Sequence, residues 1–359
     1  MTGRFRVVDT GVREGRFNLA VAQAMIERHK AGRIPDTFRF MRFPPTALIG
    51  RHQALGQEID VPHCRAHGVG IVRRITGGGA IYLDEGQLGW GLVFRRSALG
   101  PGSLAEIARD ICVAVAAGLR KLGVEARYRP RNDIEVDGRK ISGTGGFFDG
   151  DTLIYQGTVL VDMDPSAMVA ALRVPRAKLE KRQLDSAAQR VVTLRELLGP
   201  KAPSLPAIQR ALLEAFTERF GVAWQEEDLG AEEEELAWRH HREEIGTDAF
   251  VAEIDDPAHE SDFAAGTHAG PGGSITTYVR LEGPVRARIG QVLITGDFFI
   301  APPRTVLDLE AALRGAYVEE TTGIIQRFFQ ERTIAALSAG PDDFRASLEA
   351  AIAAAGASR

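Results

Sequence analysis

The stretch RRITGGGAIYLDEGQLGWGLVF, residues 73–94, places three consecutive glycines just after two arginines. A glycine weakens a strand or helix interior by roughly 0.5–1 kcal/mol relative to alanine, so Gly77, Gly78 and Gly79 together need a physical reason. One interpretation is a tight turn between two strands. The other is an open backbone against which an anionic group lies, with Arg73 and Arg74 supplying charge. The stretch alone leaves both open.

The residues that follow the glycines have the pattern of a strand. Leu88, Trp90, Leu92 and Phe94 recur at every second position, so they share one face, while Gly89 and Gly91 fall on the opposite face. Glycines on one face of a strand leave room for a ligand or another backbone. We therefore expect a strand, a glycine turn and a second strand.

Working outward, helices and strands alternate on both sides of this stretch. Residues 103–122 read as a helix, because Ser103 and Glu106 form a capping box. Asp137-Gly138 is the signal of a two-residue hairpin, which pairs Val136 with Arg139 and Glu135 with Lys140. The order predicts an α/β (α+β) fold; its further elements are a helix at 18–30, strands at 37–43 and 152–162, and a helix at 204–221.

A change in composition suggests a domain boundary. Residues 226–244 are dense in charge, and residues 255–274 are poor in large apolar side chains and rich in Gly, Ala, Pro and Asp. Such a composition is typical of a linker. We expect a large domain at 1–245, a linker at 246–272 and a small domain at 273–359.

The overall composition excludes several classes of protein. The chain has 359 residues and a formal net charge of −4, which gives no global nucleic-acid footprint. Its two cysteines, Cys64 and Cys112, form neither a disulfide framework nor a metal motif. The chain has no long apolar run and no signal-peptide pattern at its start. We expect a cytoplasmic monomer that binds neither nucleic acid nor membrane and has no dedicated metal site.

Four residues outside the glycine stretch are candidates for chemistry. Lys140 could form a cross-strand ion pair with Glu135, worth about 0.2–1 kcal/mol. It could instead serve as a point charge for an acyl oxygen or a phosphate, because it leads into a second glycine-rich segment. Asn132 and Asp133 suit either turn chemistry or contact with a nucleotide or metal. Cys64, near His67, is a conceivable thiolate nucleophile.

Read in order, three stretches and the tail resemble the lipoate–protein ligases. The stretches are LIGRHQ (48–53), RRITGGGAIY (73–82) and GRKISGTG with QGTVLVD (138–145 and 156–162), and the tail is GDFF (296–299) followed by LEAALRG (309–315). The resemblance implies a mixed-sheet catalytic domain of the kind shared with biotin–protein ligases, and a small C-terminal α/β accessory domain. It also implies that lipoate and MgATP form lipoyl-adenylate and pyrophosphate, after which a lysine of a lipoyl domain attacks the adenylate.

The resemblance implies cofactors, partners and residues. ATP and Mg²⁺ would serve lipoate activation. The acceptor would be the glycine cleavage H protein, a 2-oxoacid dehydrogenase acyltransferase or a dedicated lipoate-binding protein. Lys140 matches the catalytic lysine, and Asn132 and Asp133 match a pair near the nucleotide and its metal. The matches to the acyl-adenylate-binding segments are Arg73, Arg74, Thr76, Gly77, Gly78, Gly79, Ala80, Tyr82, Gly143, Gln156 and Gly157.

The chain also departs from the family pattern. Leu83 and Gln156 stand where the family commonly has histidine, and Ala22-Gln23 stands where it commonly has an acidic pair. These departures suggest a non-standard acceptor. Two rivals are an ATP-independent octanoyl or lipoyl amidotransferase, which needs a cysteine nucleophile, and a non-catalytic lipoate or lipoyl-adenylate sensor.

Overall fold

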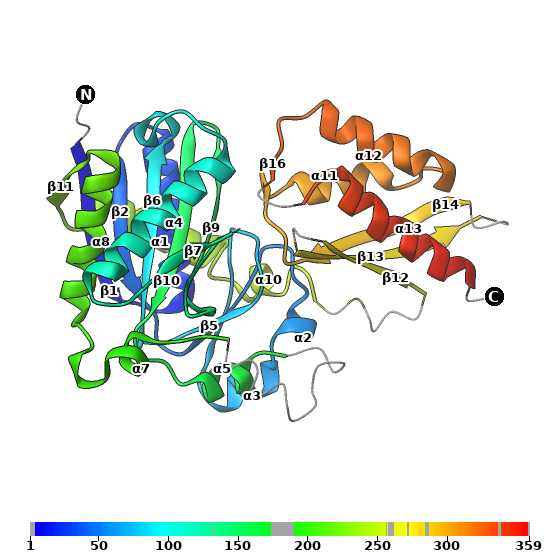
Figure 1. The fold of residues 1–359 in the computed structure, drawn as a ribbon. Coiled ribbons are helices and arrows are strands. Elements are labelled where there is room, and N and C mark those ends of the chain that lie inside the picture. Colours follow the sequence, from blue (N-terminus) through cyan, green and yellow to red (C-terminus); the bar gives the residue numbers. More distant parts are fainter. Residues whose placement is uncertain are drawn as a thin grey trace. The chain divides into compact units, whose positions relative to one another are not determined.

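The computed structural model describes residues 4–130, 132–173, 190–255, 257, 262–270, 273–283, 287–336 and 339–357. The chain forms two compact units (Figure 1). The first unit comprises residues 1–48, 59–73 and 81–251, and the second comprises residues 49–58, 74–80 and 252–359. The second unit therefore includes two short segments from the N-terminal half of the chain, and one of them carries the three glycines.

The first unit is built on a mixed eight-stranded sheet in the order β11-β1-β2-β6-β10-β9-β8-β7. The β11–β1 and β1–β2 pairs are parallel, and the pairs from β2 to β7 are antiparallel. A smaller sheet has the order β4-β3-β5. The predicted mixed-sheet α/β class is confirmed. The strands are β1 (Arg4–Val12), β2 (Thr37–Arg42), β3 (Thr46–Ile49), β4 (Gly70–Arg73), β5 (Ile81–Leu83), β6 (Gln87–Arg95), β7 (Arg127–Arg129), β8 (Asp133–Val136), β9 (Arg139–Asp149), β10 (Thr152–Leu160) and β11 (Ala223–Glu226).

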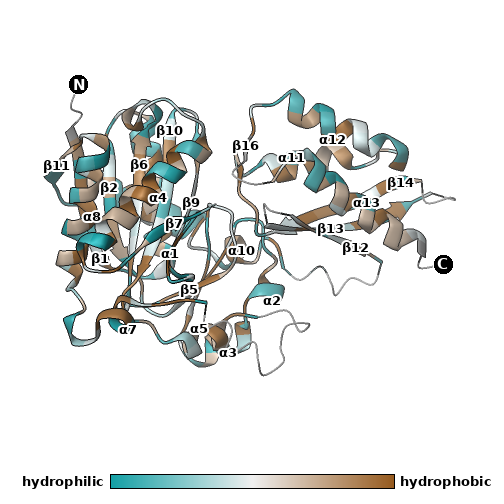
Figure 2. Cartoon of the chain, in the orientation of Figure 1, coloured by the Kyte–Doolittle hydropathy of each residue, from teal (hydrophilic) through white to brown (hydrophobic). Residues whose placement is uncertain are grey.

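Helices pack on this sheet through their apolar residues. Helix α4 begins with the predicted capping box between Ser103 and Glu106, and it packs against α8. Figure 2 shows brown and teal turns on α8, as expected for a helix with one buried face. The helical segments are α1 (Gly15–Lys30), α3 (Val61–Ala66), η1 (Arg96–Leu99), α4 (Leu104–Lys121), α5 (Pro165–Ala171), α7 (Leu194–Leu198), η3 (Gly199–Lys201), α8 (Leu205–Phe220), α9 (Ala231–Glu243) and α10 (Asp248–Val251).

Strand β6 has the two faces that its sequence predicts. Leu88, Trp90, Leu92 and Phe94 are all buried, and Trp90 lies among aromatic rings of Phe38, Tyr155 and Phe216. The apolar face therefore belongs to the core. The Met41 side chain covers the glycine face: a Cβ on Gly89 would lie 3.0 Å from Met41 Cγ, and one on Gly91 would lie 3.6 Å from Met41 Cε and 3.9 Å from Gln156 Cβ.

The second unit has a three-stranded antiparallel sheet in the order β12-β13-β14. Its core includes Ile275, Val279, Phe298, Leu309 and Phe344. The elements are α2 (Leu55–Glu58), β12 (Ala264–Gly270), β13 (Gly273–Glu282), β14 (Arg288–Gly296), β15 (Ile300–Ala301), α11 (Thr305–Leu313), η5 (Val318–Glu320), α12 (Thr321–Gln330), β16 (Ala335–Ala336) and α13 (Pro341–Ala357).

The interval 246–272, predicted as a linker, contains helix α10 and strand β12. The described part of this interval is therefore not a continuous linker, because small residues also suit a closely packed strand. In β12 they permit close packing: a Cβ on Gly266 would lie 2.0 Å from the backbone nitrogen of Ala351 in α13. The glycine therefore lets the helix approach the strand backbone.

Among the described residues, no helix combines the length and the hydrophobicity that crossing a bilayer requires.

Candidate functional site

The hairpin of β8 and β9 brings Lys140 and Asp133 together. Lys140 Nζ lies 2.8 Å from Asp133 Oδ1, and the Arg129 guanidinium lies 2.7 Å from Asp133 Oδ2. Burial raises the pKa of Asp133, but the Lys140 and Arg129 charges and hydrogen bonds outweigh it, so the pKa ends below its ordinary value. The carboxylate is therefore ionised and holds the lysine ammonium in place.

The predicted hairpin register is confirmed, but the predicted ion pair is not. Asp137 and Gly138 both have positive φ, as a type I′ turn requires, and Glu135 pairs with Lys140 in the ladder. A bulge between Ile134 and Glu135 then shifts the strand. Lys140 consequently pairs with Asp133, and Glu135 lies 3.3 Å from Arg129.

The sequence analysis did not predict two features around Lys140. Its backbone N–H donates to Arg190 O at 2.8 Å, and its carbonyl accepts from Val192 N at 2.9 Å, so a segment fifty residues away anchors it. Arg129 is the other missed residue. The alternating arginines of RYRPRND are a signal for it, because Arg129 and Asp133 face each other in the β7–β8 register.

Gly143 gives the lysine side chain its space. A Cβ on Gly143 would lie 2.5 Å from Lys140 Nζ and 2.6 Å from Cε. The lysine chain therefore lies over this glycine, with the Asp133 carboxylate beside it. Asn132 joins the group through its side-chain amide, which donates to Thr144 O.

Gln156 and Gly157 lie next to each other on β10 but have opposite surroundings. Gln156 stands between Gly91 of β6 and Gly145 of β9, so glycines flank it on both sides. Gly157 stands between Trp90 and Thr144, and a Cβ there would lie 2.5 Å from the Trp90 ring. Gly157 is thus required by close packing, whereas the Gln156 side chain shares the glycine-lined face of the sheet.

The glycine loop belongs to the second unit, and its backbone packs on protein. Gly78 N donates to Phe298 O at 3.3 Å, and a Cβ on Gly77 would lie 2.1 Å from the same oxygen. Gly78 has φ +95°, which favours glycine. The backbone of GDFF lies against this loop at Gly77 and Gly78, so protein fills the space beside these two glycines. Gly79 has Asp297 as its nearest neighbour, at 3.8 Å from a Cβ.

The two arginines bind protein carbonyls. Arg74 Nη2 donates to Gly77 O at 3.1 Å and Gly79 O at 2.8 Å, so it braces the glycine loop from within. Burial lowers the pKa of Arg74 to about 10. Arg73, in the first unit, donates to Phe250 O and Val251 O at the end of α10. Carbonyls at a helix C-terminus are good partners for a guanidinium.

The remaining predicted residues frame the glycine loop in the chain. Thr76 is buried, and its carbonyl accepts from Arg51 N at 2.9 Å. Ala80 ends the loop, and Tyr82 lies on β5 opposite Ala47. Burial raises the pKa of Tyr82, and the carboxylates of Asp84 and Asp164 raise it further.

Both cysteines are buried in the first unit. Cys64 has no solvent exposure, and burial raises its pKa to about 11. The ring of His67 stacks on His63, and its Nδ1 lies 2.9 Å from His63 O. The interpretation of Cys64 as a thiolate activated by His67 is therefore wrong. Burial also raises the pKa of Cys112, whose thiol lies in the core.

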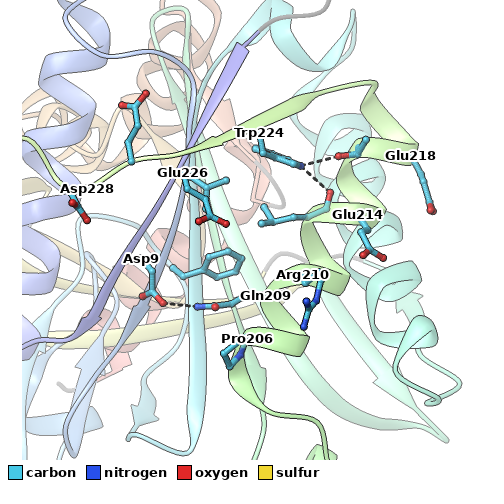
Figure 3. A pocket seen from close by; sticks show the side chains of 14 residues that line it. Asp9, Pro206, Gln209, Arg210, Glu214, Glu218, Trp224, Glu226 and Asp228 are labelled. Atoms are coloured by element: carbon cyan, nitrogen blue, oxygen red, sulfur yellow. Dashed lines mark hydrogen bonds between the residues drawn. The ribbon is translucent and has the colours of Figure 1, made fainter.

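A cleft of about 880 Å³ between α8 and the edge of the large sheet contains none of the predicted residues (Figure 3). Gln209 donates to Asp9 there, and the indole N–H of Trp224 donates back to α8. Its walls would repel the phosphates of a nucleotide and the carboxylate of lipoate. The one basic lining residue is Arg210, against the acidic residues Asp9, Glu214, Glu218, Glu226, Glu227 and Asp228.

Comparison with known proteins identifies the large unit. Residues 14–217 match the lipoyl protein ligase A/B catalytic domain. The octanoyltransferase LipM of Kyrpidia tusciae is 33% identical over 257 residues, which are 65% of this chain and 93% of that protein. A bi-partite lipoate protein ligase from Thermoplasma acidophilum, solved in a study that includes its E2 lipoyl domain, is 26% identical with a TM-score of 0.63, covering 71% of this chain and 98% of that one. A lipoate-protein ligase A bound with ATP is 25% identical with a TM-score of 0.61, covering 71% and 100%.

Proposed function

The chain belongs to the lipoyl protein ligase A/B catalytic domain family, and from this premise we propose that it is an ATP-dependent lipoate–protein ligase. In the first step the lipoate carboxylate attacks the α-phosphorus of ATP, which forms lipoyl-AMP and releases pyrophosphate. In the second, a lysine amine of a lipoyl-domain acceptor attacks the acyl carbon, which forms the amide and releases AMP.

The burial of both cysteines carries this proposal. An ATP-independent transferase of this fold passes the acyl group through a thioester, which needs an accessible thiolate. The chain has only Cys64 and Cys112, both are fully buried, and burial raises both pKa values. Activation by adenylation requires no thiol. This observation favours the ligase over the transferase, although LipM is among the similar proteins.

The hairpin supplies the groups that adenylation needs. Negative charge develops on a phosphate and on an acyl oxygen, and donors already in position stabilise such charge most. Lys140, oriented by Asp133 and resting over Gly143, is such a donor. The acyl chain would lie on the glycine-lined face of β6 beside Gln156, with the Met41 side chain moving aside.

The same hairpin fits a nucleotide-bound Mg²⁺. Mg²⁺ is usually held by one or two protein oxygens together with substrate phosphates. The described residues contain no cluster of three or more His, Cys, Asp or Glu side chains that could hold a metal alone. The ionised Asp133 carboxylate and the amide oxygen of Asn132, whose nitrogen is occupied by Thr144 O, would contribute the protein oxygens. The ion would help to neutralise the phosphate charge.

The acceptor in this proposal is a lipoyl-domain protein. The Thermoplasma acidophilum ligase was studied with its E2 lipoyl domain, which supports this class of partner. Leu83 and Gln156, at positions where the family commonly has histidine, favour a dedicated lipoate-binding protein over the glycine cleavage H protein or a dehydrogenase acyltransferase. Faster lipoylation of a standard acceptor than of a dedicated one would contradict this choice.

The test of the proposed function is pyrophosphate release by the purified chain with MgATP and lipoate. We expect lipoate-dependent release, and we expect a Cys64→Ser/Cys112→Ser variant to retain it, because neither thiol takes part in the chemistry. Octanoyl transfer from a carrier protein without ATP, lost in that double variant, would instead identify a transferase. Lipoate binding without either turnover would identify a sensor.

Gly143→Ala should separate activity from stability. The added methyl group would clash with the flexible end of Lys140 and lie at an ordinary contact distance of 3.7 Å from Asp133 Oδ1. The free energy of unfolding should therefore change by less than about 1 kcal/mol, the size of an ordinary small substitution. The displaced ammonium should lower the rate of pyrophosphate release about 100-fold, as a misplacement near 1 Å can. Gly356→Ala, in helix α13 with nothing within 4 Å of the added Cβ, controls for glycine replacement. An active Gly143→Ala variant would show that the lysine position is unimportant.

A further inference from the structure

A buried chain of hydroxyl groups leads from the core to the hairpin. Asn132 and Thr144 exchange hydrogen bonds: Thr144 N and Thr144 Oγ1 both donate to Asn132 O, at 2.9 and 2.8 Å, and the Asn132 amide donates to Thr144 O. Thr144 Oγ1 also lies 2.7 Å from Tyr155 OH and 3.3 Å from Cys112 Sγ. The Tyr155 side chain is fully buried.

The direction of these hydrogen bonds follows from the chemistry of the groups. A backbone carbonyl only accepts, so the Thr144 hydroxyl must spend its single proton on Asn132 O. Thr144 Oγ1 must then accept from Tyr155, which keeps its own proton because burial raises the pKa of its hydroxyl well above the ordinary value. The Cys112 thiol completes the chain as a weak donor. The Tyr155 hydroxyl thus orients the Thr144 hydroxyl, which in turn holds the Asn132 carbonyl.

We propose that Thr144 and Tyr155 are positioning residues that aim the Lys140 ammonium by holding the Asn132 peptide. The next residue after Asn132 is Asp133, whose Oδ1 lies 2.8 Å from Lys140 Nζ. The residue before Thr144 is Gly143, over which the lysine chain lies. Thr144 is therefore joined to the glycine that contacts the Lys140 side chain. Through its hydrogen bonds to Asn132, it also helps to fix the Asp133 carboxylate. Neither Thr144 nor Tyr155 need touch substrate.

The kinetic consequence of this inference rests on the proposed function. The positioning of Lys140 can be tested even if that function is wrong. Loss of the Thr144 hydroxyl leaves Asn132 O with one donor instead of two. The Asp133 carboxylate would then sit less firmly against Lys140, and the Lys140 side chain would become more mobile. An isolated stability role would not produce that change in a variant that stays folded.

The experiment compares Thr144→Val, which removes the hydroxyl, with Thr144→Ser, which keeps it. We expect Thr144→Val to lower kcat for lipoate-dependent pyrophosphate release about 10- to 100-fold, the range of a modest misplacement, with little change in KM for lipoate. Thr144→Ser should stay within about 3-fold of the parent chain because its donor is retained. Tyr155→Phe, which keeps the ring, should act like Thr144→Val and guards against a variant that fails to fold.

Two further measurements make the outcome decisive. In a Lys140→Ala background, Thr144→Val should add no further loss, because it acts through the lysine. At one fixed pH, NMR relaxation of the Lys140 side chain should show larger-amplitude motion in Thr144→Val than in Thr144→Ser. Equal rates and equal mobility of the Lys140 side chain in the two variants would overturn the proposal. Inactivity of the parent chain with MgATP and lipoate would overturn the ligase function alone, and the Lys140 relaxation would still test the positioning role.

Discussion

Lys140→Ala should lower the rate of lipoate-dependent pyrophosphate release about 10²- to 10³-fold, equivalent to about 2.7–4 kcal/mol of lost transition-state stabilisation. This is the loss seen when one preorganised donor to a developing negative charge is removed. Lys140 is such a donor, because its flexible cationic end is held beside the carboxylate of Asp133. Initial rates should be measured at saturating MgATP and lipoate, so that the loss reflects kcat.

The Lys140→Ala variant should remain folded, which allows its rate to be interpreted. Asp133 keeps its contact with Arg129 at 2.7 Å, so its charge is not left unpaired. Lys121→Ala is the matched control. Lys121 ends helix α4, pairs with Glu218 of α8 and lies in no proposed site. The control should keep the parent rate. A Lys140→Ala variant with a rate near that of the control would contradict the assigned role.

The sequence predicts the register of the β8–β9 hairpin but not the ion pair of Lys140. Asp137-Gly138 predicts the turn and the register because two adjacent residues with positive φ allow few alternatives. The partner of Lys140 could not be predicted, because the bulge after Ile134 moves Asp133 to the lysine in place of Glu135. A bulge depends on how the whole sheet is packed, and no local pattern encodes this one.

The neighbours of the glycine loop could not be predicted from the local sequence. Three glycines and two arginines are compatible with a tight turn and with an anion-binding backbone, and the structure places the Phe298 carbonyl against Gly77 and Gly78. The contact joins segments about 220 residues apart, and nothing near the glycines indicates it. The structure gives two of the glycines a physical reason, since Gly78 has a positive φ and Gly77 a close backbone neighbour. Whether the loop also binds an acyl-adenylate stays a prediction.

Glu233→Ala should destabilise the large unit by about 3–5 kcal/mol, the usual result of removing one partner of a buried ion pair. Glu233 of α9 forms a two-pronged pair with Arg6 of β1, with oxygen–nitrogen distances of 2.7 and 2.8 Å. Both side chains are less than 5% exposed. Among the described residues, the remaining buried Arg6 charge would keep Thr37 Oγ1 as its side-chain partner, at 3.2 Å from Nε. Urea unfolding followed by tryptophan fluorescence would measure the change.

The neighbouring residue on α9 provides the control for that prediction. Glu234 pairs with Arg13 at 2.7 Å, but its side chain is 40% exposed, so Glu234→Ala should cost less than about 1 kcal/mol. The two pairs adjoin each other on one helix and differ in burial and in number of contacts, because Glu233 binds Arg6 through both oxygens and also accepts from Gly230 N, whereas Glu234 makes one contact with Arg13. The double change Arg6→Met/Glu233→Leu should recover most of the loss, since it removes both charges and refills the space with apolar atoms. Equal destabilisation by Glu233→Ala and Glu234→Ala would show that the Arg6 charge finds water or another partner when Glu233 is absent.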